Sequence, residues 1–319
     1  MSNGVKIWLY KSASHCPPPP PPPPRQPRLQ TSISTTTERN YLLKPVCVSR
    51  YIYTYTCRLP SKMSSANDKA LQLRNLHIPG KPLVFANVYD ASSARIVAAN
   101  SSSTALATAS YAVAAVHGVS DDDLDLETNL ASARRIASVA DEFNKPLSVD
   151  MQDGYGSRLE ESIESIIAAG ASGCNLEDKD NETGKLFPLD VAVDRVRRVM
   201  AAAVKAGVPD FVLNARTDAV LLHKDLEDAI VRGKAFLEAG ATTVFVWGGL
   251  SRADVERLAK EFGGMLNVSL LPGGLTVQEL ADIGVARISV GPRMWRLAMN
   301  TVEEQSKKLL DEYAAMQAK

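Results

Sequence analysis

Short apolar runs alternate with longer amphipathic stretches between Pro82 and Pro292. Each run ends in a change to polar residues or a turn signal, which predicts a strand. The predicted strands are Leu83–Ala86, Ala105–Thr108, Pro146–Asp150, Gly173–Glu177, Phe211–Arg216, Thr243–Val246, Leu266–Ser269 and Arg287–Val290. Strands that alternate with helices form parallel βαβ units, and eight such units in about 240 residues fit a closed (β/α)₈ barrel. We therefore predict an α/β fold of the (β/α)₈ TIM-barrel type.

The amphipathic stretches predict the helices between these strands. Asp90 is a plausible N-cap for the first of them, because its carboxylate can accept a hydrogen bond from a free backbone N–H group. The later helices are predicted at Leu126–Phe143, Arg158–Ala169, Val191–Ala206, Lys224–Ala239, Ser251–Phe262, Thr276–Ile283 and Met294–Met316. The last helix is long for a closing element. Its end, Gln305–Lys319, is expected either to pack on another subunit, with a helix swapped between subunits as one form of this packing, or to pack back on its own barrel.

Residues 1–65 differ in composition from the rest of the chain. Pro17–Pro24 is an unbroken proline run, which favours polyproline II. We predict a disordered Pro-rich extension over residues 1–65 and a barrel with C-terminal helices over residues 66–319. The acid-poor, Ser/Thr-rich extension also has the composition of a targeting segment, which would place the protein in mitochondria, although eight prolines oppose the amphipathic helix of such segments.

Charge, hydropathy and cysteine content limit the classes of partner and the compartment that the sequence supports. Residues 1–62 hold nine Lys or Arg and one acid, so the remainder holds 27 basic and 35 acidic residues. An acidic body argues against nucleic acid as a partner. No apolar run approaches the roughly 20 residues that span a bilayer, so no membrane partner is expected. Cys174 is the one cysteine after residue 62, which gives no internal disulfide framework and favours the cytoplasm.

Polar residues gather where the third, fourth and fifth predicted strands end, the place where TIM barrels build their active sites. These residues are Asp150, Gln152, Asp153, Glu177, Asp178, Arg216 and Asp218. Side chains alternate along a strand, so Asp150 and Gln152 should share a face, with Glu177 on the next strand. One or two carboxylates with water ligands suit Mg²⁺. We predict that Asp150 and Glu177 hold Mg²⁺, with Mn²⁺ as an alternative; otherwise these acids cap loops or pair with Arg216 and Lys179.

Arg216 is the candidate for the anionic end of a substrate, because a guanidinium binds a carboxylate or phosphonate in bidentate fashion. A salt bridge with Asp218 or Glu177 is the alternative. Asn214 should lie on the same face as Arg216. Trp247, after the sixth strand, either narrows the pocket or packs in the core. The polar segment Asp180–Pro188 is expected to be a lid, or else a static surface loop.

Several segments resemble the isocitrate lyase and phosphoenolpyruvate mutase superfamily over roughly Pro79 to Glu304. These segments are Asn87-Val-Tyr-Asp-Ala-Ser-Ser-Ala-Arg, Thr108-Ala-Ser-Tyr-Ala-Val-Ala-Ala-Val-His-Gly, Ser148-Val-Asp-Met-Gln-Asp-Gly-Tyr-Gly, Gly173-Cys-Asn-Leu-Glu-Asp-Lys and Asn214-Ala-Arg-Thr-Asp-Ala. The resemblance implies an enzyme that depends on Mg²⁺ and forms or cleaves C–C or P–C bonds of small 2-oxo acids through a pyruvate enolate. It also implies tetramers that exchange a C-terminal helix.

The resemblance assigns roles to individual positions. Asp150 matches the direct metal ligand, Glu177 matches a further acid of the metal site, and Asp121 matches an acid that supports the metal in its second shell. Arg216 matches the arginine that grips a carboxylate or phosphonate. The loop that cradles the pyruvate-like carboxylate with its backbone is matched by Ala109, Ser110 and Tyr111.

The sequence departs from the superfamily pattern in three places. Gln152 stands where a second metal-site carboxylate is usual, so it is at most a weak ligand. The segment Asp180–Pro188 has no cysteine, which argues against a standard isocitrate lyase. Asn181 and Lys185 are the catalytic candidates there, as analogues of the Asn and Lys in phosphoenolpyruvate mutase lids. The chain looks closest to the carboxyphosphonoenolpyruvate mutase-like branch.

We therefore expect a lyase, mutase or hydrolase that acts on a small 2-oxo carboxylate or phosphonate, in a homo-oligomer that is a dimer or tetramer. Two other hypotheses stay open. The first is a barrel that binds a metabolite without catalysis. The second is a class I aldolase in which Lys179 forms a Schiff base with the substrate.

Overall fold

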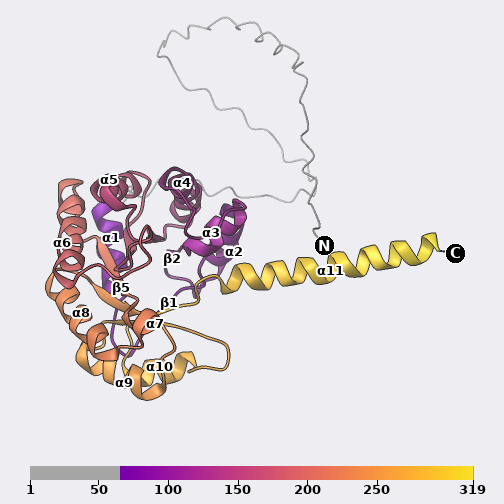
Figure 1. The fold of residues 1–319 in the computed structure, drawn as a ribbon. Helices are drawn as coiled ribbons and strands as arrows, with labels where there is room; N and C mark the ends of the chain where they lie inside the picture. The colour runs from indigo at the N-terminus through magenta and orange to yellow at the C-terminus, as the bar shows by residue number, and fades with distance from the viewer. Residues whose placement is uncertain (1–64, 319) are drawn as a thin grey trace, which may run out of the picture. The chain divides into compact units, whose positions relative to one another are not determined.

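The computed structural model describes residues 65–318, and its core is one curled sheet of parallel strands (Figure 1). The strands follow the order β1-β8-β7-β6-β5-β4-β3-β2. They are β1 (Leu83–Val84), β2 (Leu106–Ala107), β3 (Leu147–Asp150), β4 (Gly173–Glu177), β5 (Val212–Thr217), β6 (Thr243–Val246), β7 (Leu266–Ser269) and β8 (Arg287–Ser289). An isolated parallel bridge joins Val88 to Thr108 where the first and last strands of this order approach each other. The predicted eight-stranded α/β fold is confirmed, and it is consistent with a TIM-type barrel.

Helices follow the strands as the sequence pattern predicts. The helices are α1 (Ala66–Asn75), α2 (Ala91–Ala99), α3 (Ser110–Val116), α4 (Leu126–Glu142), α5 (Leu159–Ala168), α6 (Leu189–Lys205), α7 (Ala219–His223), α8 (Leu226–Glu238), α9 (Arg252–Glu261), α10 (Val277–Ile283) and α11 (Arg293–Gln317), with a 3₁₀ turn at Gly156–Arg158. Asp90 caps α2 as predicted, since its side chain accepts a hydrogen bond from the backbone of Ser93. The pattern missed α1, α3 and α7. The first of these begins at a capping box between Ser65 and Asp68.

Apolar side chains fill the layer between sheet and helices, whereas the inside of the sheet is partly polar. Asn214 is fully buried there, and its amide donates to Asn175 Oδ1 at 2.9 Å. Arg287 is only 1% exposed, and its Nη2 donates to the same oxygen at 3.0 Å. Cys174 faces the apolar layer instead, in the buried cluster that it shares with Val149 and Leu213.

The C-terminal helix α11 has no buried residue, and residues 301–318 are all exposed. Figure 1 shows α11 extending away from the sheet. The expectation that this end packs back on its own barrel is therefore wrong, while packing on another subunit stays a prediction. The predicted N-terminal extension lies outside the described residues. Within residues 65–318, no helix combines the length and the apolar character that a membrane crossing requires.

Candidate active site

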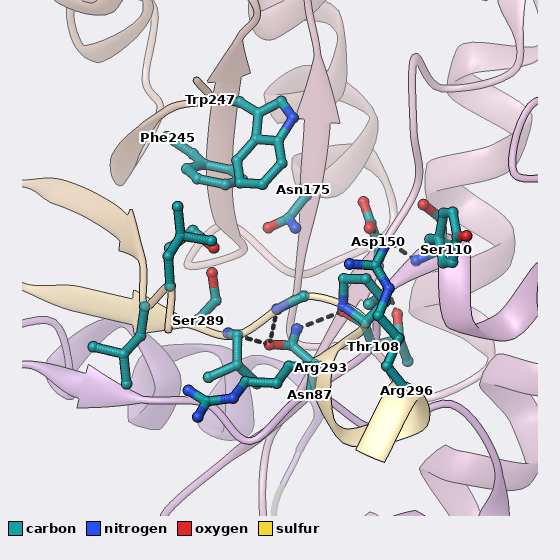
Figure 2. A pocket seen from close by; sticks show the side chains of 18 of the residues that line it. Asn87, Thr108, Ser110, Asp150, Asn175, Phe245, Trp247, Ser289, Arg293 and Arg296 are labelled. Carbon is teal, nitrogen blue, oxygen red and sulfur yellow. Dashed lines mark hydrogen bonds between the residues drawn. The ribbon is translucent and has the colours of Figure 1, made fainter. Parts of the chain in front are cut away.

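A cavity of about 600 Å³ opens where the strands end, and each of the eight strands contributes to its lining, either directly or through the segment that follows it. Its volume falls in the range of about 300–1,000 Å³ that small-molecule sites occupy. Figure 2 shows Phe245 and Trp247 at one side and Asn87, Arg293 and Arg296 at the other. The two aromatic rings lie 5.7 Å apart between centroids. Trp247 therefore stands on the cavity wall.

Asp150 ends β3 and faces this cavity. The backbone N–H of Ser110 donates to Asp150 Oδ2 at 2.9 Å, and the backbone N–H of Asp150 donates to Thr108 Oγ1 at 2.8 Å. Asn129 donates to the Asp150 carbonyl oxygen at 2.9 Å. These bonds fix the carboxylate beside the loop of Ala109, Ser110 and Tyr111, which also lines the cavity.

The alternation predicted after Asp150 stops at once, because the chain turns. Gln152 has a φ of 51°, in the left-handed region, and Gly154 and Tyr155 follow with positive φ. The Gln152 amide donates to the Asp121 carbonyl at 2.6 Å and to Asp121 Oδ1 at 3.1 Å. Asp153 points elsewhere and accepts from the backbone of Tyr155. Gln152 therefore does not share a face with Asp150 as predicted, and its amide orients the Asp121 carboxylate instead.

Asp121 lines the cavity next to this amide. Burial raises the pKa of the Asp121 carboxyl, and the nearby charge of Asp150 raises it further. Glu177 lies differently. Asp150 stands opposite Asn175 in the sheet, while Glu177 stands opposite Arg216, two positions beyond. Glu177 is buried and is not among the cavity-lining residues, so it is not the immediate neighbour of Asp150 that the sequence predicts.

Arg216 makes both of the ion pairs that were left open as alternatives. Its Nε and Nη2 donate to the two carboxylate oxygens of Asp218 at 2.6 and 2.9 Å, and its Nη1 donates to Glu177 Oε1 at 2.7 Å. Burial raises the pKa of the Glu177 carboxyl, and the Arg216 charge opposes that rise. Burial alone would lower the pKa of Arg216, but the two carboxylates raise it overall. Its guanidinium also borders the cavity.

The charges at this end of the sheet do not balance. The four carboxylates of Asp121, Asp150, Glu177 and Asp218 lie within electrostatic range of Arg216, and Arg287 is a second cation near Asp150, so acids outnumber bases here. Within the described part of the chain, no three His, Cys, Asp or Glu side chains are grouped closely enough to hold a metal ion together. The surplus of carboxylates fits a Mg²⁺ site, in which Asp150 would bind the cation and the other acids would hold its water ligands, because Mg²⁺ in proteins usually keeps several waters.

The segment predicted as a lid is a small hairpin. Lys179 and Leu186 form an antiparallel bridge, and the Asp180 N–H donates to the Lys185 carbonyl at 2.9 Å. The Asn181 N–H donates to Asp153 Oδ2 at 3.3 Å. Neither Asn181 nor Lys185 lines the cavity in this structure. Lys179 pairs with Asp122 at 3.4 Å and lies outside the cavity too, so the geometry gives no support to a Schiff base on it.

A further predicted site residue lies outside the cavity, and three of the residues that line it were not predicted from the sequence. Asn214 lies inside the sheet, where Thr243 Oγ1 donates to its side chain at 2.6 Å, and it does not line the cavity. Asn87 was missed as a site residue. It donates to the Thr108 carbonyl at 2.8 Å and accepts from the Val290 N–H at 2.9 Å, which ties the segments after β1, β2 and β8 together. Arg293 and Arg296 were also missed, although their place just after the last strand was a signal for them.

Comparison with known proteins finds similar sequences and similar structures. The family model described as phosphoenolpyruvate phosphomutase matches residues 73–310. An uncharacterized protein of Mycobacterium tuberculosis is 30% identical over 224 residues, 69% of this chain and 82% of that protein. The chloroplastic carboxyvinyl-carboxyphosphonate phosphorylmutase of Arabidopsis thaliana is 31% identical over 61% of this chain and 59% of that protein.

Solved structures extend the likeness to the whole fold. The crystal structure of 2,3-dimethylmalate lyase, a member of the PEP mutase/isocitrate lyase superfamily, superimposes with a TM-score of 0.70. The two chains are 26% identical, and the match covers 77% of this chain and 88% of that one. Relatives of this chain are therefore lyases and phosphomutases. On these matches, the chain belongs to the phosphoenolpyruvate phosphomutase family, within the PEP mutase/isocitrate lyase superfamily.

Proposed function

We propose that the protein is a Mg²⁺-dependent lyase or phosphonomutase-like enzyme. It cleaves or rearranges a C–C or P–C bond of a small 2-oxo carboxylate or phosphonate through a pyruvate enolate. One observation carries the proposal: Asp150 stands at the cavity wall within a surplus of carboxylates, beside a backbone loop suited to a carboxylate. Family membership supports the reaction class.

The residues divide the work by their positions. Asp150 would hold the metal directly, and Asp121, oriented by Gln152, would hold one of its water ligands. Glu177 would act from a greater distance through water. The metal, Mg²⁺ or Mn²⁺, would stabilise the negative charge that develops on the enolate oxygen, as a Lewis acid.

The substrate's 2-oxo acid end would lie against residues 109–111, with Arg216 facing it. Because Glu177 and Asp218 take three of the N–H groups of Arg216, its remaining N–H groups are held in a fixed direction. Phe245 and Trp247 exclude water from one side of the cavity. A catalytic role of Asn181 and Lys185 requires the hairpin of residues 179–186 to move toward the cavity.

A turnover assay on the full chain, with and without Mg²⁺, tests this function. The panel is oxaloacetate, 2-methylisocitrate, substituted malates, phosphonopyruvate and phosphoenolpyruvate, followed by release of pyruvate, glyoxylate and phosphate. We expect metal-dependent release from one of them. Asp150→Asn should lower that rate at least about a hundredfold, because it removes the charge that holds the cation.

Asp122→Asn is the matched control, since it removes the same charge from an exposed neighbour of Asp121 outside the cavity. It should keep most of the activity. Full activity of Asp150→Asn, or a rate unchanged by chelation of the metal, would contradict the proposal. Ligand binding without turnover across the panel would favour a non-catalytic metabolite-binding barrel instead.

We also propose that the chain forms a homo-oligomer in which α11 packs on another copy. The exposed face of α11 carries large apolar side chains, at Leu297, Met299, Val302, Leu309, Leu310, Tyr313 and Met316. Apolar side chains in this number favour burial against a partner surface. Light scattering should give a dimer or tetramer, and charged substitutions at Leu309 and Leu310 should shift it toward the monomer.

A further inference from the structure

Two arginines on one wall of the cavity are not used by the function proposed above. Arg293 is the first residue of α11, and Arg296 follows three positions later, so the two share one side of the helix. Both line the cavity. Figure 2 shows them across the cavity from Phe245 and Trp247, with Arg293 next to Asn87 and Arg296 on the side of Thr108. We call these two residues the arginine pair.

The arginine pair has no acidic partner. Within residues 65–318, neither guanidinium makes an ion pair or a side-chain hydrogen bond to a protein group. Arg216, in the same cavity, has three of its N–H groups on two carboxylates. The carbon at the centre of the Arg296 guanidinium lies 5.0 Å from the centroid of the Tyr111 ring, a cation–π distance that keeps it at the wall without neutralising it.

Helix stability does not explain these positions. The first turn of a helix carries the positive end of the macrodipole, which favours acids and disfavours cations. The first turn of α11 holds no acid, and the N-cap residue before it, Pro292, makes no side-chain cap. Two positive charges at this place raise the energy of the empty protein, and a bound anion would lower it.

The size of the cavity leaves room for such an anion. A three-carbon 2-oxo acid placed against Ser110 and Asp150 fills only a part of about 600 Å³. Apolar groups of Leu270, Leu271 and Val290 line the space between the strand ends and α11. The lining of the cavity therefore combines the polar groups of Asp150 and Ser110, apolar side chains and two further cations, one of which, Arg296, lies over Tyr111.

We propose that Arg293 and Arg296 bind a second oxyanion, a carboxylate or phosphonate, at the end of the substrate distal to its 2-oxo acid group. They would thereby select substrates with two acidic ends over those with one. A guanidinium can hold either group through two parallel N–H bonds. The inference rests on the proposed function for where the 2-oxo acid end lies.

Matched pairs of probes test the inference by binding, without any need for turnover. 2-Oxoglutarate and 2-oxovalerate have the same chain and differ in a distal carboxylate against a methyl group. Phosphonopyruvate and 2-oxobutyrate differ in a distal phosphonate against a methyl group. Affinity for the full chain is measured by calorimetry with Mg²⁺ present. We expect the dianionic member of at least one pair to bind about tenfold more tightly or better, and the pair that shows this identifies the distal group.

Arg293→Gln and Arg296→Gln should each lower the affinity for the dianionic probe about tenfold and leave that for its monoanionic partner unchanged. Arg293→Lys and Arg296→Lys should restore part of the difference, because they keep the charge without the planar fork. Arg134→Gln is the matched control, since Arg134 is an exposed arginine of α4 that lies outside the cavity.

Equal affinity of the wild-type chain for both members of both pairs would overturn the inference. So would a loss in the glutamine variants that is the same for both members. Either result leaves the proposed function intact if metal-dependent turnover is observed. Conversely, a silent turnover assay with selective binding by the arginine pair would refute the proposed reaction and keep the anion site.

Discussion

Arginines stand on two sides of the same cavity in opposite circumstances. On the side of β4 and β5, Arg216 is hydrogen-bonded to the carboxylates of Asp218 and Glu177, and these two charges raise its pKa. On the side of β8 and α11, Arg293 and Arg296 have no acidic partner within residues 65–318. The charge of Arg216 is therefore neutralised within the protein. The charges of Arg293 and Arg296 would be neutralised only by a bound anion. Whether an arginine has an acidic partner in the protein thus distinguishes one that stabilises the fold from one that contacts a ligand.

The buried Arg287 adds a third circumstance. It is more deeply buried than Arg216, but its bonds go to neutral groups, Asn175 and Ser148, and its Nε and Nη1 have no hydrogen-bond partner. Burial lowers the pKa of Arg287 to about 9. The charge of Asp150 opposes that fall without forming an ion pair with Arg287. A buried charge that is hydrogen-bonded only to neutral groups contributes little to stability or costs some. Burial alone therefore does not tell which arginine stabilises the fold.

Replacement of Arg216 by Met should have the largest effect on stability. The change leaves Glu177 and Asp218 buried without a cation, and breaking a buried pair in this way costs about 3–5 kcal/mol. Urea unfolding at pH 7 measures it. Arg287→Met is the control: it makes the same change of volume at a more deeply buried arginine that forms no ion pair within residues 65–318, and we expect its free energy of unfolding to stay within about 1 kcal/mol of wild type. Equal losses in both variants would contradict the distinction between them.

Much of this site follows from the sequence, and the parts that do not have physical reasons. Asp150 and Arg216 line the cavity, as their positions at strand ends predict. The alternation of strands and helices makes the strands parallel, so their carboxyl ends lie at the same end of the sheet. The pattern fails at Gln152, since a left-handed turn redirects its side chain toward Asp121. It also fails for Glu177, because the stagger between β3 and β4 places Asn175 opposite Asp150. Register depends on contacts between distant segments, which a periodic pattern does not contain.

Acid should destabilise the protein through His77, next to Arg287. Burial, together with the nearby charge of Arg287, lowers the pKa of His77 to about 3, and the His77 Nδ1 lies 2.8 Å from the Leu73 carbonyl oxygen, to which it is hydrogen-bonded. The unfolded chain, with a pKa near 6.5, binds more protons between these values, so stability is lost as pH falls below about 6.5. From pH 7 to pH 5, wild type should lose about 2 kcal/mol more than His77→Gln, as urea unfolding at both pH values shows. Parallel losses in the two proteins would rule out His77 as the cause.

The smallest effect should have the opposite sign, and it comes from the arginine pair. Because Arg293 and Arg296 stand at the positive end of α11 without an acidic partner, Arg293→Gln and Arg296→Gln should each raise the free energy of unfolding, by about 0.3–1 kcal/mol. Thermal unfolding at low salt measures the gain, and added salt should reduce it by screening. A variant that is more stable and yet binds dianionic probes less well is what a ligand contact predicts. If these variants instead lose stability as Arg216→Met does, Arg293 and Arg296 stabilise the fold in the same way as Arg216. That result would contradict their assignment as an anion-binding site.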